Sequence, residues 1–311
     1  MTVSLAGQVA AVSGGGRGLG RAYALDLAAH GAKVIINDNG CDLTGRGEDP
    51  GPADEVVAAI KAAGGEAVAS YADVGSDDGA YSIVRLAMDT WGRLDAIVAN
   101  AGMLRDSALH NLKEEDWDAV LKTHLRGCYA LMHHAWPVFR QQSYGRVVLA
   151  TSSAGLYGNF GQTNYGSAKA GMVGLMNVSK LEGAKYNINV HLIAPIASTR
   201  MTMALMSPDR QVASRPELVA PAVTYLCSPQ CTDSGYIIEA GAGTFNRCSF
   251  VKSKGLAVDT TSQPDAGWVE SNWAAITDLE GAVPMWDLAR TREAYAAAQA
   301  AGNAGQRAGS L

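Results

Sequence analysis

The stretch Val9-Ala-Ala-Val-Ser-Gly-Gly-Gly-Arg-Gly-Leu-Gly20 decides the fold, because a short apolar strand, a glycine-rich turn and the start of a helix follow one another in it. Gly14 permits a tight turn, Gly18 lets the backbone approach a pyrophosphate, and Gly20 allows close helix–strand packing. Free N–H groups at the helix start would face the phosphates. A glycine-rich run alone also fits a purely structural turn, but this order of elements favours a dinucleotide site. The residues expected at the cofactor are Gly14, Arg17, Gly18, Leu19 and Gly20.

Apolar strands and helical segments alternate in the residues that follow the turn. The apolar residues of each strand are continuous, which is typical of strands covered on both faces. Strands that alternate with helices predict a parallel sheet with right-handed crossovers. We expect strands at residues 9–12, 34–36, 67–69, 96–99, 147–150 and 188–193, and helices at 19–30, 53–63 and 78–91. The predicted fold class is α/β, with a Rossmann-type doubly wound parallel sheet.

The chain is interpreted as a single domain with a C-terminal extension, since it contains no internal repeat and no linker. Residues 1–245 form the expected Rossmann domain. The alternation of strands and helices stops there, and residues 246–311 contain Trp268, Trp273 and Trp286. These tryptophans indicate an extension that packs near the substrate site or against a partner subunit, with its last residues frayed.

Composition excludes several classes of partner. With 25 Lys and Arg against 30 Asp and Glu, the formal net charge is -5, which argues against a nucleic-acid surface. No apolar stretch is long enough to span a bilayer, and the first residues lack the features of a secretory signal. The 5 cysteines contain no CxxC pair, as suits reduced thiols in a cytoplasm. Cys227 and Cys231 could be half of a metal site, but no His or Cys pair stands nearby in the sequence, so we expect no metal.

Asp38 stands at the end of the second expected strand. A carboxylate there can accept both ribose hydroxyls of a dinucleotide and would repel a 2′-phosphate, which favours NAD. Arg17 favours NADP instead, because a guanidinium can pair with a phosphate. We give Asp38 more weight because it sits at the ribose. NAD is therefore the expected cofactor and NADP the alternative, although Asp38 could also be a simple turn residue before Asn39-Gly40.

Tyr165-Gly-Ser-Ala-Lys169 lies at the start of an expected helix, and Ser152 closes the strand before it. The tyrosine and the lysine are one helical turn apart and share a face. A free phenol has a pKa near ~10, and a neighbouring ammonium lowers that pKa towards the range of a useful base. Ser152 could hold a substrate oxygen near the phenol. This set predicts proton transfer at an oxygen whose carbon gives or takes a hydride.

These features together resemble the short-chain dehydrogenase/reductase family over residues 5–245. The matching residues are Gly14, Gly18, Gly20, Asp73, Val74, Asn100, Ala101, Gly102, Ser152, Tyr165 and Lys169. The resemblance implies that Asp73 contacts the adenine and that Asn100-Ala101-Gly102 supports the cofactor and the sheet. It also implies that Lys169 binds ribose and that Pro195 lies in the wall beside the nicotinamide. A homodimer or homotetramer, formed by helices near residues 117–133 and 163–185, is implied in the same way.

A narrower resemblance is to the dehydrogenase part of the peroxisomal multifunctional enzymes of type 2 and to their bacterial single-domain relatives. Residues 20–25, 102–106, 124–127 and 157–162 carry it. It implies NAD-dependent oxidation of a (3R)-3-hydroxyacyl-CoA, with a fatty acyl or sterol side chain, to the 3-oxoacyl-CoA in a bacterial cytoplasm. Two alternatives stay open: an NADPH-dependent reductase of 3-oxoacyl groups, ketones or steroids, and a non-enzymatic NAD-binding regulator.

His124 occupies the position where many short-chain dehydrogenases carry an Asn that orders a proton-relay water. A histidine, with an ordinary pKa near ~6.5, could relay protons itself, or could only support a kink in its helix. The methionines between Arg200 and Met206 suit a variable apolar ligand or, equally, a packed helix. Arg105, Arg200 and Arg247 are candidates for contacts to CoA phosphates.

Overall fold

The structure, a computed structural model, describes residues 3–203, 206–258, 263–285, 288–293 and 296. It consists of two compact units, Met1–Arg247 and Cys248–Leu311, and each is described by itself. Trp286 and the last residues, which were expected to fray, lie outside the described residues. Residues 204 and 205 of the methionine-rich segment also lie outside them.

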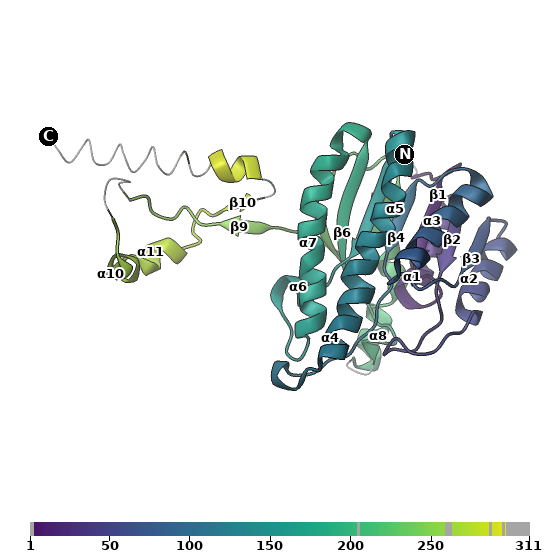
Figure 1. The fold of residues 1–311 in the computed structure, drawn as a ribbon, viewed down its shortest axis with the longest axis horizontal. Coiled ribbons are helices and arrows are strands. Elements are labelled where there is room, and N and C mark those ends of the chain that lie inside the picture. Colours follow the sequence, from purple (N-terminus) through teal and green to yellow (C-terminus); the bar gives the residue numbers. More distant parts are fainter. Residues whose placement is uncertain (1–2, 204–205, 259–262, 286–287, 294–295, 297–311) are drawn as a thin grey trace. The chain divides into compact units, whose positions relative to one another are not determined.

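A single sheet runs through the first unit (Figure 1). In the described part of the chain eight strands follow the order β3-β2-β1-β4-β5-β6-β7-β8, and the ladders from β3 to β7 are all parallel. The chain builds outward from β1 to β3 and then crosses back to β4, which confirms the doubly wound α/β fold. The strands are β1 Val9–Ser13, β2 Lys33–Asn37, β3 Ala67–Ser70, β4 Ala96–Ala99, β5 Gly145–Ala150, β6 Ile188–Ile196, β7 Ile237–Gly241 and β8 Thr244–Cys248.

Helices cover the sheet in two sets. One set brings α1 against α2 and α9, and the other brings α3 against α5 and α4 against α7. Buried side chains between α1, the sheet and α9 form a large part of the core, among them Val12, Tyr23, Leu27 and Val223. The helices are α1 Gly18–Ala29, α2 Gly51–Ala62, α3 Asp77–Trp91, α4 Glu114–Leu121, α5 Gly127–Gln142, α6 Ser153–Tyr157, α7 Thr163–Gly183, α8 Pro208–Ala213 and α9 Ala220–Cys227.

Local chemistry sets several of these boundaries. The Ser76 hydroxyl accepts the Gly79 N–H at 3.0 Å and caps the start of α3, which satisfies one of the donors that a helix start leaves free. Gly92 ends the same helix at φ 71°, in the left-handed region that glycine tolerates. The expected helix at residues 78–91 therefore begins one position early and ends where the sequence indicated.

The helix that carries His124 contains an irregular turn. A π-helical segment, Lys122–Arg126, separates α4 from α5. Such a segment inserts one residue into the usual hydrogen-bond ladder and often occurs at a functional site. His124 lies in the middle of it, and support of a kink in the helix was one of the two interpretations of this residue.

The second unit is small and contains little regular structure among its described residues. Strand β9, Phe250–Lys252, pairs antiparallel with β10, Val283–Met285. The short helices α10, Ala266–Ser271, and α11, Trp273–Thr277, lie between these strands in the sequence. Across the described residues of both units, every helix is too short or too polar to cross a membrane.

Candidate active site

The turn between β1 and α1 is as tight as its glycines suggested. Gly14 has φ +64°, and a Cβ added there would lie 2.8 Å from the Cα of Ala101. Gly18 has φ +52°, also in the region that glycine favours. Gly20 packs against the carbonyl of Gly14, where a side chain would collide with the backbone. At these three positions the turn therefore carries no side chain that could keep a dinucleotide away from the backbone.

Ser13 ties the turn to the end of β4. Its hydroxyl oxygen accepts the backbone N–H groups of Asn100, at 3.1 Å, and Ala101, at 3.2 Å. The Asn100 side-chain amide donates to the carbonyl of Gly14 at 3.3 Å. The Asn100-Ala101-Gly102 segment thus holds β1, β4 and the glycine turn together at the carboxyl edge of the sheet.

Asp38 follows β2 directly and faces the turn. Its two carboxylate oxygens accept the backbone N–H groups of Gly16, at 2.9 Å, and Gly40, at 2.8 Å. Arg17 also approaches the loop after β2, where its guanidinium donates to the carbonyls of Gly40 and Cys41 at 3.4 Å each. The carboxylate is fixed by backbone contacts, and the guanidinium is occupied by loop carbonyls.

A cleft of 360 Å³ runs along the carboxyl ends of β1, β2 and β4. Its walls include ten residues that the sequence assigned to the cofactor: Gly14, Arg17, Gly18, Leu19, Asp38, Asp73, Val74, Asn100, Ala101 and Gly102. Its lining also includes Thr199, Arg200 and Met201, which follow β6. Four other residues assigned to the cofactor, Gly20, Tyr165, Lys169 and Pro195, are not part of this lining. Asp73 forms an ion pair with Lys122 across 3.2 Å at the edge of the cleft.

Ser152, Tyr165 and Lys169 come together beyond β5. Ser152 caps α6, and its hydroxyl bonds the Tyr165 phenol. Lys169 is 3% exposed, its Nζ donates to the carbonyl of Ala150 at 2.6 Å, and the same atom lies 5.4 Å from the centroid of the Tyr165 ring. The hydroxyl of Thr151 donates to the carbonyl of Lys169 at 2.8 Å and fixes this turn of α7 against β5.

Burial acts on the two titratable groups in opposite directions. It raises the pKa of the Tyr165 phenol, and the Asp106 carboxylate adds to the rise while the Ser152 hydroxyl opposes it. It lowers the pKa of the Lys169 ammonium to about 8. The expectation that Tyr165, with Lys169 beside it, has a pKa below that of a free phenol is therefore wrong: the pKa is raised. Desolvation of the phenol exceeds the stabilisation that its neighbours provide.

His124 is buried beside Tyr165. Its ring meets the Tyr165 ring edge-on, with centroids 5.1 Å apart, and its Nε2 lies 2.8 Å from the Met103 carbonyl and 3.1 Å from the Met103 nitrogen. Its Nδ1 is buried without a hydrogen-bond partner among the described residues. Burial, helped by the charge of Lys169, lowers the pKa of His124 to about 3. A neutral imidazole held by the Met103 backbone is suited to support that backbone. This geometry therefore favours the supporting role of His124 over the proton relay.

Sequence reasoning missed Asn164, which is fully buried at the start of α7. Its amide nitrogen donates to the carbonyls of Arg105, at 2.8 Å, and Asp116, at 3.3 Å. Its amide oxygen accepts the Tyr165 N–H at 2.8 Å. A polar residue directly before the tyrosine was the available signal, but its partners come from distant segments and are visible only in the fold.

Two of the three candidate phosphate contacts, and one thiol of the possible metal half-site, have other partners. The Arg105 guanidinium pairs with Asp116 at 3.2 Å, and that of Arg247 lies over the Tyr236 ring at 3.8 Å, whereas Arg200 is exposed at the rim of the cleft. Cys231 lies 3.6 Å from His191. Among the described residues, no three His, Cys, Asp or Glu side chains gather in a way that could hold a metal.

A Rossmann sheet with a cleft at its carboxyl edge and a serine, a tyrosine and a lysine grouped beyond β5 is the arrangement that the sequence associated with an oxidoreductase. The short-chain dehydrogenase family model matches residues 8–210. A Mycobacterium tuberculosis protein assigned to the short-chain type dehydrogenases/reductases is 50% identical over 275 residues, or 88% of this chain and 96% of that protein. The chain belongs to the short-chain dehydrogenase family and is an oxidoreductase of that family.

The alignments with two relatives that have more specific names include a smaller share of each relative's length. Mouse peroxisomal multifunctional enzyme type 2 is 43% identical over 277 residues, which are 89% of this chain but 37% of the mouse enzyme. A 3-oxoacyl-[acyl-carrier-protein] reductase of Synechocystis is 37% identical over 232 residues, 72% of this chain and 91% of that protein. The resemblance to multifunctional enzymes is confirmed, and this chain spans little more than a third of the mouse enzyme.

Solved structures agree with this assignment. Full-length peroxisomal multifunctional enzyme type 2 of Drosophila melanogaster superposes with a TM-score of 0.81 at 34% identity, covering 96% of this chain and 50% of that one. A 7α-hydroxysteroid dehydrogenase complexed with NADH and 7-oxo glycochenodeoxycholic acid gives a TM-score of 0.70 at 25% identity, covering 77% and 95%. A structural neighbour of this fold therefore binds a nicotinamide dinucleotide.

Proposed function

We propose that the protein oxidises (3R)-3-hydroxyacyl-CoA esters, with a fatty acyl or sterol side chain, to 3-oxoacyl-CoA with NAD. The observation that carries the proposal is the grouping of Ser152, Tyr165 and Lys169 beyond β5, at the sheet edge where the dinucleotide cleft also lies. Fold alone would not favour one reaction over another, because function resides in the site.

The residues around the cleft fit a dinucleotide. The glycine turn offers bare backbone at a helix start, which suits a pyrophosphate. Asp38 places a carboxylate, held by two backbone N–H groups, at the end of β2. A 2′-phosphate there would meet a fixed negative charge, while the guanidinium of Arg17 is engaged by the carbonyls of Gly40 and Cys41. These contacts support NAD over NADP.

The chain's own residues handle the oxygen of the substrate. When bound, NAD supplies the acceptor for the hydride that leaves the hydroxyl-bearing carbon. The Ser152 hydroxyl hydrogen-bonds that oxygen, and the Tyr165 phenolate takes its proton as the carbonyl forms. Lys169, charged below its pKa of about 8, stabilises the phenolate. His124 stays neutral and holds the Met103 backbone in place.

The name of one relative supports an acyl substrate, since the Synechocystis protein is a 3-oxoacyl-[acyl-carrier-protein] reductase. A peroxisomal multifunctional enzyme is similar over nearly nine-tenths of this chain, and the Mycobacterium tuberculosis relative matches over 96% of its own length. Met103 and Met201 line the cleft, and flexible thioethers adapt to apolar groups of variable shape. A homodimer in a bacterial cytoplasm, with β-oxidation as its setting, completes the proposal.

Turnover of a (3R)-3-hydroxyacyl-CoA with NAD tests the proposal, with Tyr165→Phe as the decisive variant. We expect the wild-type enzyme to produce NADH and the variant to retain NADH binding but lose about 10³-fold in kcat, because the base is missing while the cleft is intact. Thr163→Ser, which changes the same helix start, should keep wild-type turnover. An active Tyr165→Phe variant would contradict the assigned role.

A further inference from the structure

The loop between β2 and α2 is preorganised beside the cleft. Its ends are joined by the Asp49 N–H, which donates to the carbonyl of Asn39 at 3.0 Å. Inside it, the Asp42 carboxylate accepts the N–H groups of Thr44, at 2.8 Å, and Arg46, at 3.0 Å. Residues 39–49, here called the cofactor loop, therefore form a closed turn held by its own polar contacts.

The cofactor loop is fastened to the segment that follows β4. The Leu104 N–H donates to the carbonyl of Leu43 at 3.0 Å, and the Arg105 Nε donates to the carbonyl of Thr44, also at 3.0 Å. Gly45, at φ +81°, lies so close to the Met103 sulfur that a side chain would collide with it. Leu43, Gly45 and Arg105 all line the dinucleotide cleft.

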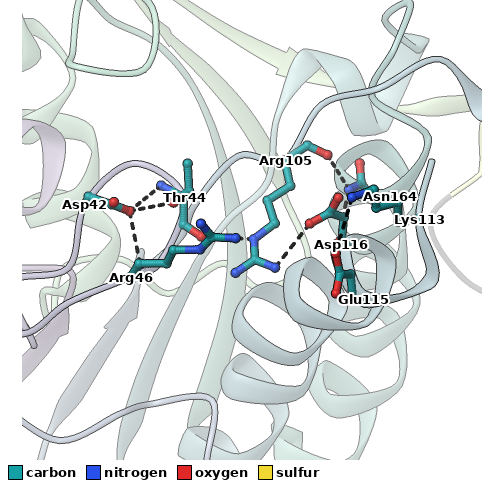
Figure 2. A network of polar contacts seen from close by, with 8 residues as sticks. All are labelled: Asp42, Thr44, Arg46, Arg105, Lys113, Glu115, Asp116 and Asn164. Carbon is teal, nitrogen blue, oxygen red and sulfur yellow. Dashed lines mark hydrogen bonds and ion pairs between the residues drawn. The ribbon is translucent and has the colours of Figure 1, made fainter. Parts of the chain in front are cut away.

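Arg105 connects this loop with the catalytic helix (Figure 2). Its Nη1 pairs with the Asp116 carboxylate of α4 at 3.2 Å, and the two side chains are only 18% and 27% exposed. The carbonyls of Arg105 and Asp116 both accept from Asn164, and the oxygen of that amide holds the Tyr165 N–H. One guanidinium therefore joins the loop, α4 and, through Asn164, the residue that carries the phenol.

We propose that Arg105 is a positioning residue that couples the cofactor loop to Tyr165. A planar guanidinium satisfies the Thr44 carbonyl and the Asp116 carboxylate at once, which a lysine ammonium does not reproduce. A dinucleotide in the cleft would contact the loop on one side, and the same side chain fixes the segment that Asn164 uses to hold the tyrosine. The inference rests on the proposed function, with NAD in this cleft and Tyr165 as the base.

Arg105→Met and Arg105→Lys test the coupling, with Arg85→Met as the matched control. Arg85 forms an exposed pair with Asp89 on α3 and lines no part of the cleft. We expect both Arg105 variants to weaken NADH binding and to lower kcat, each by about tenfold, because a small misplacement of reacting groups is costly. We also expect faster amide hydrogen exchange at Leu104 and Tyr165.

Two further measurements separate positioning from general stability. Guanidinium ion at millimolar concentration should restore part of the lost turnover to Arg105→Ala, and should do nothing for Arg85→Met. NADH affinity and hydrogen exchange need no substrate, so they report on the coupling even if the acyl-CoA proposal fails. Unchanged NADH affinity, exchange rates and kcat per folded protein in Arg105→Met would overturn the inference.

Discussion

Tyr165 and Lys169 share one environment but respond to it with opposite shifts in pKa. Desolvation disfavours the charged form of each, so the phenol holds its proton more firmly and the ammonium less firmly. At neutral pH Lys169 is still charged, since its pKa of about 8 lies above 7. Its Nζ lies 5.4 Å from the centroid of the Tyr165 ring, where a positive charge would favour a phenolate. We therefore expect the rate of oxidation to rise with pH.

Removing that ammonium should displace the pH profile. In Lys169→Met we expect kcat/KM for oxidation at pH 7 to fall by about 100-fold and the rising limb of the profile to move at least ~1 unit to higher pH, because a nearby positive charge no longer favours the phenolate. Initial rates from pH 6 to 10 measure this. Lys113→Met, at an exposed site on the surface, should keep the wild-type profile. If the Lys169→Met rates are lower at every pH but the rising limb does not move, the lysine does not tune Tyr165 and acts only in binding.

His124 should make stability fall in acid. Its pKa is lowered to about 3 in the folded protein, so below its ordinary value of about 6.5 the unfolded chain binds a proton that the folded chain excludes. Stability is therefore lost as pH falls from 6.5 towards 3. His124→Asn should lose on the order of 2 kcal/mol less than wild type between pH 7 and pH 5. Urea unfolding at both pH values checks this.

A matched variant makes that test specific. His110 is exposed, so His110→Asn should show the wild-type difference between the two pH values. If His124→Asn and wild type lose the same free energy of unfolding, the imidazole of His124 titrates freely and the account of a neutral support is wrong.

Single functional residues could be predicted from the sequence where the pattern that marks them is local. Tyr165 and Lys169 share a helical turn, and Asp38 follows a recognisable strand, so all three could be named without coordinates. The partners of Arg105 come from the cofactor loop, from α4 and from the start of α7. From the sequence, Arg105 was therefore a candidate for a contact to a CoA phosphate. Its partners within the protein are distant in the sequence and could not be predicted from it.

Among the elements, the end of β2 should decide the choice of cofactor. Asp38 is held by the N–H groups of Gly16 and Gly40, so its charge stays where the adenosine ribose would lie. We expect Asp38→Asn to raise the ratio of NADP to NAD efficiency by about 10- to 100-fold, since a charged acceptor is lost together with its repulsion of a phosphate. Asp54→Asn, at an exposed position of α2, is the control and should keep the wild-type ratio. Ratios of kcat/KM for both cofactors provide the measurement.

The strands β1 to β6 were predicted because their continuous apolar runs are flanked by turns. Strand β7 was not, since Glu239 interrupts the apolar residues of Ile237–Gly241. The π-helical segment Lys122–Arg126 leaves no pattern in the sequence, because its extra residue only shifts the hydrogen-bond ladder. Regular elements were thus accessible from periodicity, and irregular ones required the tertiary structure.

For the whole molecule, the outer faces of two helices predict association. Tyr129 of α5 and Val178 and Leu181 of α7 are each at least half exposed, which is unfavourable for apolar surface that stays in water. We expect a homodimer at twice the chain mass of 32.4 kDa. Val178→Asp should shift the mass measured by light scattering towards the monomer, whereas Val212→Asp, on exposed α8, should not. A wild-type monomer would exclude this assembly.

The central claim concerns the whole reaction, and the stereochemistry of turnover tests it most directly. Initial rates would be compared for (3R)- and (3S)-3-hydroxyacyl-CoA esters and for 17β-hydroxysteroids, each with NAD and with NADP. The account predicts selective turnover of the (3R) thioesters with NAD. Turnover of steroids alone, of the (3S) esters, or with a clear preference for NADP would contradict it.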